Sequence, residues 1–274
     1  MAKLEKKDIR NRINKEKLIP IVPNLLTTSG LILGLASIMT SLEIVTLTGY
    51  SDFSSEKIFM KFWWASAFIG FAVIMDMFDG KVARALKSSS KFGTSYDSLS
   101  DLVSFGVAPA VLIYVWCLMS FGKLALMAIF FYVVCAALRL ARFNIQSKDA
   151  EKDNFTGLPS PMAAGLILAP ILLFSEFHIA PAGNMTLYYL FATPILGLIM
   201  VSDIPYKKFP DFSNVGQFNV LVIGAIIITA VITNPGIMVA IVTTSYFLLG
   251  LSTFIFDQFK KRVESKKERE IINR

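Results

Sequence analysis

The sequence holds very few of the residues on which many soluble enzymes rely for catalysis. Its 274 residues include one histidine, His178, and two cysteines, Cys117 and Cys135. The histidine is expected in a short loop, which argues against a histidine-based proton relay or catalytic base. Both cysteines lie inside apolar segments without metal-ligand spacing. We therefore expect two small buried hydrophobic residues and no disulfide framework.

Charged residues are also scarce. They make up 17% of the chain, against 54% hydrophobic residues, and the mean hydropathy is +0.60. Soluble domains seldom combine such values with repeated apolar stretches of near membrane-spanning length. The net charge of +7 comes from basic residues that gather at the expected helix ends and at both termini. That distribution is typical of membrane topology, so no nucleic-acid partner is expected.

The chain is predicted to be an all-α, polytopic membrane helix bundle with both termini in the cytoplasm. Residues 1–20 form a basic segment, either an interfacial helix on anionic lipid or a solvated tail. Residues 21–256 form the transmembrane domain, and residues 257–274 form a charged cytoplasmic tail that is expected to be helical. About eight helices are predicted, near 22–46, 61–86, 97–120, 123–146, 160–176, 185–202, 217–233 and 236–256.

The distribution of Lys and Arg supports this topology. With eight spans and cytoplasmic termini, all but three of the 27 basic residues fall on the cytoplasmic side. The three exceptions are Lys57, Lys61 and Lys123. Such an excess on one side is the positive-inside pattern. It predicts an integral protein of the cytoplasmic (inner) membrane.

Four aspartates interrupt this apolar background: Asp76, Asp79, Asp97 and Asp101. Ionisable residues inside membrane segments are costly and usually mark a functional site. Spacings of three and four residues place each pair on one helix face. A short loop between the two helices lets them face each other in antiparallel orientation, so all four carboxylates are expected to meet in one pocket at the cytoplasmic ends.

Four acids of one sign cannot neutralise one another, whereas divalent cations can bind all of them. Oxygen-only ligation favours Mg²⁺ or Mn²⁺, and four carboxylates suit two such ions. Arg84 lies near the same face and is expected to hold a phosphate oxygen or to serve as a positive-inside anchor. A different class, a divalent cation transporter, would also place acids in the membrane. However, these acids gather at one edge and do not span the depth.

These residues follow a longer pattern, in which glycines, an alanine and an arginine hold defined offsets from the acids. The pattern is Asp76-x2-Asp79-Gly80-x2-Ala83-Arg84-x8-Gly93-x3-Asp97-x3-Asp101. It resembles the signature of the CDP-alcohol phosphotransferases at every fixed position. The resemblance implies a membrane enzyme that uses an alcohol to displace CMP from a CDP-linked donor.

The resemblance also implies roles for the signature residues. Asp76, Asp79 and Asp97 would bind two divalent cations, Mg²⁺ or Mn²⁺. Asp101 would be the general base and a further ligand. Six further residues would contact the nucleotide and diphosphate of the donor: Gly80, Ala83, Arg84 and Gly93, together with Asn24 and Thr27 of the first helix. For Asn24 and Thr27, helix capping is the alternative. For Gly93, the alternative is a simple backbone bend.

Segments outside the signature resemble the serine-accepting, bacterial integral-membrane members of this family. They include Pro23 to Thr27, Arg139 to Asn144, Phe155 to Gly165 and Val201 to Tyr206. One departure is Gly30, where such members often have asparagine. The implied substrates are CDP-diacylglycerol and L-serine, in contact with membrane lipid. Glycerol 3-phosphate and inositol phosphate are the alternative acceptors.

Residues outside the signature are candidates for binding the acceptor or a lipid phosphate: Arg139, Arg142, Asn144 and Ser160. Arginine presents a fork that matches a carboxylate or a phosphate, and positive-inside anchoring is the alternative for both arginines. The active site is expected to face the cytoplasm. The resemblance further implies a homodimer.

Overall fold

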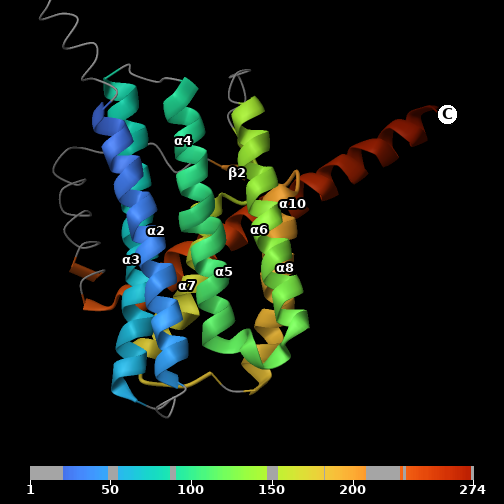
Figure 1. Ribbon diagram of the computed structural model, residues 1–274. Helices are drawn as coiled ribbons and strands as arrows, with labels where there is room; N and C mark the ends of the chain where they lie inside the picture. The colour runs from blue at the N-terminus through green and yellow to red at the C-terminus, as the bar shows by residue number, and fades with distance from the viewer. Residues whose placement is uncertain are drawn as a thin grey trace, which may run out of the picture.

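The computed structural model describes residues 21–48, 55–86, 91–146, 154–181, 183–207, 229–230 and 233–272. Within these ranges the chain is a helical bundle (Figure 1). Its main helices are α2 (Ile21–Thr48), α3 (Glu56–Ala85), α6 (Lys123–Gln146), α7 (Ser160–Glu176), α8 (Gly183–Val201) and α10 (Pro235–Ile272). Between α3 and α6 a continuous helical stretch comprises α4 (Lys91–Asp101), η1 (Leu102–Val107), α5 (Ala108–Ile113), η2 (Tyr114–Leu118) and η3 (Met119–Phe121).

The prediction of a polytopic helical protein is confirmed in its coarser form. Six helical segments within the described residues are long and apolar enough to cross a membrane, and α7 is a shorter apolar helix. The predicted helix 217–233 lies almost entirely outside the described residues, as does the basic segment 1–20. The tail beyond residue 256 is helical as expected and continues α10 without a break to Ile272.

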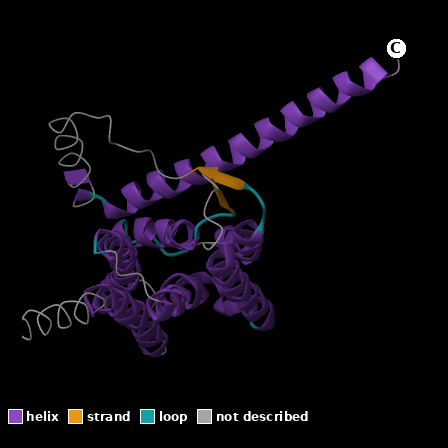
Figure 2. Cartoon of the chain, turned by 90° about the horizontal axis from the view of Figure 1, so that it is seen from above, coloured by secondary structure: helices purple, strands orange, loops and turns teal. Residues whose placement is uncertain are grey.

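Helix α2 packs along both α3 and α4, so three helices surround one end of the bundle (Figure 1). Gly34 lets α2 approach η1 closely, because a Cβ built there would meet Oγ of Ser104 at 2.7 Å. On the other side of the bundle α6 packs against α8. Seen from above in Figure 2, the long helix α10 runs obliquely across one side of the bundle, where it contacts α7.

A short two-stranded antiparallel sheet lies beside α10 (Figure 2). It pairs β1 (Asn154–Thr156) with β2 (Pro205–Lys207). Gly157 follows β1 with φ +81°, and a Cβ there would meet the carbonyl oxygen of Met200 at 2.1 Å. Only glycine fits this turn, because the conformation is left-handed and the backbone approach leaves no room for a side chain. The sheet therefore joins the entry to α7 with the exit from α8.

Candidate metal and phosphate site

A small cavity opens between α2, α3 and α4, at the helix ends that were predicted to lie on the cytoplasmic side. Its lining is mainly acidic and hydroxylic, with a few apolar side chains. The lining residues are Leu26, Thr27, Gly30, Ala72, Asp76, Asp79, Asp97, Ser100, Asp101, Ser104 and Phe105. Three helices and η1 thus contribute to the cavity, and all four predicted aspartates reach it.

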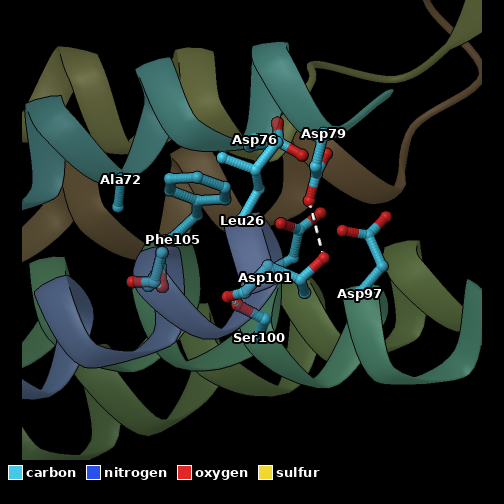
Figure 3. A pocket seen from close by; sticks show the side chains of 11 residues that line it. Leu26, Ala72, Asp76, Asp79, Asp97, Ser100, Asp101 and Phe105 are labelled. Atoms are coloured by element: carbon cyan, nitrogen blue, oxygen red, sulfur yellow. Dashed lines mark hydrogen bonds between the residues drawn. The ribbon is translucent and has the colours of Figure 1, made fainter. Parts of the chain in front are cut away.

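The aspartates converge from two helices. Asp76 and Asp79 come from α3, Asp97 and Asp101 come from α4, and their side chains point toward one another in Figure 3. One carboxylate oxygen each from Asp76, Asp97 and Asp101 can be chosen so that all lie within 4.8 Å of one another. Asp79 is only 5% exposed and lies close enough to Asp97 for their side chains to interact. Helical spacing put each pair on one face, as expected.

Hydroxyl groups of α2, α4 and η1 hold this arrangement together. Thr27 donates a hydrogen bond from Oγ1 to a carboxylate oxygen of Asp79 at 2.8 Å. Ser100 donates to the carbonyl oxygen of Thr27 at 3.0 Å, and Ser104 donates to the carbonyl oxygen of Gly30 at 3.0 Å. Helix α2 is therefore bonded to both acid-bearing helices and fixes the distance between them.

The charges of the site fit a hard cation. Two like charges about 4 Å apart repel by about 4 kcal/mol at an effective dielectric constant of about 20. Arg139 of α6 exerts an attractive electrostatic effect on Asp76 and Asp101, but one arginine cannot balance four carboxylates. A group of oxygen donors with this spacing and net charge is the donor set that Mg²⁺ and Mn²⁺ prefer.

The predicted nucleotide-binding residues occupy different positions around the cavity. Thr27 lines it, whereas Asn24, one turn earlier on α2, accepts a hydrogen bond from Thr28 through its carbonyl oxygen. Gly80 is exposed on α3, and a Cβ there would meet nothing within 4 Å, so its face is open to a ligand. Gly93 lies in the first turn of α4. The side chains of Ala83 and Arg84 lie outside the described part of the structure.

The predicted acceptor residues lie at three separate places and do not line the cavity. Arg139 donates from Nη1 to the hydroxyl of Ser160 at 2.8 Å, and Ser160 is itself buried. Arg142 instead donates to the carbonyl oxygen of Val201 at 3.0 Å and to the carboxylate of Asp203. The two arginines share a face of α6 but bind different partners.

Asn144 belongs to neither arginine group. Its side chain donates to the hydroxyl of Ser98 at 2.8 Å. Ser98 directly follows Asp97 on α4. Asn144 therefore connects the end of α6 to the acid-bearing helix.

Sequence reasoning missed several residues of the cavity. The apolar and small members are Leu26, Ala72 and Phe105, and the hydroxyl members are Ser100 and Ser104. A signal for the serines was present, because each follows an aspartate by three residues in the run from Asp97 to Ser104. Spacing of three places aspartate and serine on neighbouring parts of one helix surface.

Comparison with known proteins shows where this chain belongs. The sequence model of the CDP-alcohol phosphatidyltransferase family matches residues 20–201. A Helicobacter pylori protein named CDP-diacylglycerol–serine O-phosphatidyltransferase is 32% identical over 237 residues, 86% of this chain and 92% of the relative. A Mycobacterium leprae protein of that name is 30% identical over 246 residues, 86% of this chain and 75% of the relative. A Methanocaldococcus jannaschii protein of that name is 41% identical over 141 residues, 51% of this chain and 62% of the relative.

Proposed function

The chain belongs to the CDP-alcohol phosphatidyltransferase family, and we propose that it transfers the phosphatidyl group of CDP-diacylglycerol to L-serine. The products are phosphatidylserine and CMP. The observation that carries this proposal is the convergence of four signature aspartates on one cavity at the end of a membrane bundle. Similarity over 86% of the chain to a protein named for serine transfer supports the acceptor.

Asp76, Asp79, Asp97 and Asp101 hold two divalent cations, Mg²⁺ or Mn²⁺, in this proposal. The fit rests on the oxygen-only donors, the 4.8 Å grouping of three of them and the excess of negative charge. Bound cations of this kind neutralise charge on both the attacking and the leaving oxygens of a phosphoryl displacement.

The chain's own residues then bind the donor and move one proton. The serine oxygen forms a bond to the β-phosphorus, the bond from that phosphorus to the bridging oxygen breaks, and CMP departs with the electron pair. Asp101 accepts the proton of the serine hydroxyl, while Arg84 binds a phosphate oxygen. The residues that line the cavity include no histidine or cysteine, and in this proposal transfer proceeds directly, without a covalent phosphatidyl-enzyme.

Arg139 is the stronger candidate for gripping the serine carboxylate. Its charge attracts those of Asp76 and Asp101, so it lies near the acid cluster, while its Nη1 donates to Ser160. Its buried Nε has no hydrogen-bond partner among the described residues, which leaves one N–H donor available to a carboxylate. Arg142 already donates hydrogen bonds to Val201 and Asp203, at and after the end of α8. We expect Arg139→Lys to raise the KM for serine and Arg142→Lys to leave it nearly unchanged.

The location of the site suits a lipid donor. Acyl chains stay among the apolar helices, while the diphosphate lies at the membrane edge. The excess of basic residues supports placing that edge, and both termini, on the cytoplasmic side of the inner membrane. We further propose that two copies of this chain form a homodimer in the membrane.

The direct test is CMP release by purified protein supplied with CDP-diacylglycerol and Mn²⁺ or Mg²⁺. L-Serine, glycerol 3-phosphate and inositol phosphate are compared as acceptors. Release that depends on serine, and that is lost in Asp101→Asn, is expected. Glu43→Gln, which removes a carboxylate paired with Lys61 far from the cavity, is the matched control and should retain activity. Release driven by a different alcohol would overturn the acceptor assignment.

A further inference from the structure

The helix that carries Asp97 and Asp101 changes its winding directly after Asp101. Residues Leu102–Val107 form a π-helix, in which the N–H of Ala108 bonds to the carbonyl oxygen of Val103, five residues earlier. Such wide turns are rare and occur frequently at functional sites. Phe105, inside this π segment, lines the cavity together with Asp101. The winding of η1 therefore affects how residues are presented to the site.

Pro109 leaves one backbone group of this segment without its usual partner. In an α-helix the carbonyl oxygen of Phe105 would accept from the N–H of residue 109, which proline lacks, so the carbonyl is left with the wider π-type pairing to residue 110 or with a side-chain donor. Phe105 is only 1% exposed, so water cannot easily replace the missing donor. A buried carbonyl in this position needs another hydrogen bond.

Tyr132 of α6 supplies that bond. Its hydroxyl donates to the carbonyl oxygen of Phe105 at 3.0 Å, and the tyrosine is completely buried. The backbone of Tyr132 is backed by Gly197 of α8, whose added Cβ would meet Cα of Tyr132 at 3.2 Å. One turn further along α6, Ala136 lies against Gly106 of the π segment. The tyrosine therefore has little freedom to leave its position.

The π segment is thus held from two sides by side-chain hydroxyls. Ser104 donates to α2 on one side, and Tyr132 reaches Phe105 from α6 on the other. We propose that Tyr132 is a positioning residue for the carboxylate site. Its hydroxyl donates to the carbonyl whose α-helical donor Pro109 removes, and it thereby keeps η1 in the winding that presents Asp101 and Phe105 to the cavity. This inference rests on the proposed transfer reaction.

The test is Tyr132→Phe in the full-length protein, which removes the hydroxyl and keeps the ring. We expect kcat for serine-dependent CMP release to fall about tenfold or more, because small displacements of a catalytic group have effects of this order. The KM for CDP-diacylglycerol should change much less. The Mn²⁺ concentration for half-maximal binding, followed by electron paramagnetic resonance without substrate, should rise. The thermal midpoint of the metal-free protein reports whether the variant folds.

Two further variants make the result specific. Tyr189→Phe removes the hydroxyl of a partly buried tyrosine that packs on Trp116 and should leave Mn²⁺ binding and kcat nearly unchanged. Pro109→Ala restores an N–H that can bond to Phe105. In that background Tyr132→Phe should lower kcat and weaken Mn²⁺ binding less than it does in the wild-type chain. A double-mutant cycle measures this difference directly.

The outcomes separate the two proposals. If the wild-type protein releases no CMP with any acceptor, the proposed function fails, whereas the Mn²⁺-binding comparison still tests Tyr132. If the wild-type protein is active and Tyr132→Phe matches Tyr189→Phe in kcat and Mn²⁺ binding, the positioning role is wrong. The positioning role would also be wrong if Tyr132→Phe lowered kcat and Mn²⁺ binding equally in the Pro109→Ala and wild-type chains. The effect would then not depend on the carbonyl of Phe105.

Discussion

Removing the hydroxyl of Thr27 tests whether α2 helps to build the carboxylate site. Thr27→Val keeps the shape of the side chain but deletes the donor to Asp79, which lies at 2.8 Å. Both residues are buried, with exposed fractions of 6% and 5%, so water cannot readily take the place of the hydroxyl. Asp79 then loses the group that orients it toward the other acids.

The expected size of the effect follows from the charge of the acceptor. Hydrogen bonds to charged groups contribute about 1.5–3 kcal/mol, and about 1.4 kcal/mol corresponds to a factor of ten. We therefore expect a roughly 10- to 100-fold rise in the Mn²⁺ concentration needed for half-maximal CMP release. Substitutions behind metal-ligating groups commonly have effects of about this size. The assay is serine-dependent CMP release titrated with Mn²⁺ at saturating CDP-diacylglycerol.

Thr40→Val is the matched control on the same helix. Thr27 also bonds to the carbonyl oxygen of Pro23 at 3.1 Å, and Thr40 makes the same kind of bond to Ala36 at 2.8 Å. The control therefore removes an equivalent helix-internal bond without touching a carboxylate. Equal Mn²⁺ titrations for the two variants would refute the idea that Thr27 supports the metal site.

Three other perturbations have distinct expected outcomes. Gly34→Ala should lower stability by about 1–3 kcal/mol, because its Cβ meets a serine of the facing helix at 2.7 Å, whereas Gly70→Ala, with nothing within 4 Å, should leave the thermal midpoint in detergent nearly unchanged. Asp97→Asn should abolish turnover and weaken Mn²⁺ binding. Asp101→Asn should also abolish turnover but should retain binding of CDP-diacylglycerol better. Near-wild-type rates of CMP release in either variant would contradict these roles. Arg139→Lys should raise the KM for serine about tenfold, since lysine lacks the two-pronged contact, and an unchanged KM would remove this residue from the acceptor site.

Local patterns in the sequence were enough for the membrane class and the acid-bearing faces. The apolar stretches predicted α6 and α7 at their observed bounds, because helix length and hydropathy are properties of one segment. The start of α4 was placed too late, at Asp97 and not Lys91. Its first turns are polar and give no hydropathy signal. The helical tail beyond residue 256 was expected, and the structure adds that it continues the membrane-length helix without a break to Ile272.

The sequence by itself therefore determined that four carboxylates lie on two helix faces in a membrane-embedded chain. Residue identity and helical spacing are sufficient for that inference. Only the tertiary structure decided that Thr27 of α2 bonds to Asp79, that Arg139 binds Ser160 while Arg142 binds Asp203, and that Tyr132 donates to Phe105. These contacts join residues 21 to 61 positions apart. They depend on how whole helices pack against one another, which no local spacing in the chain encodes.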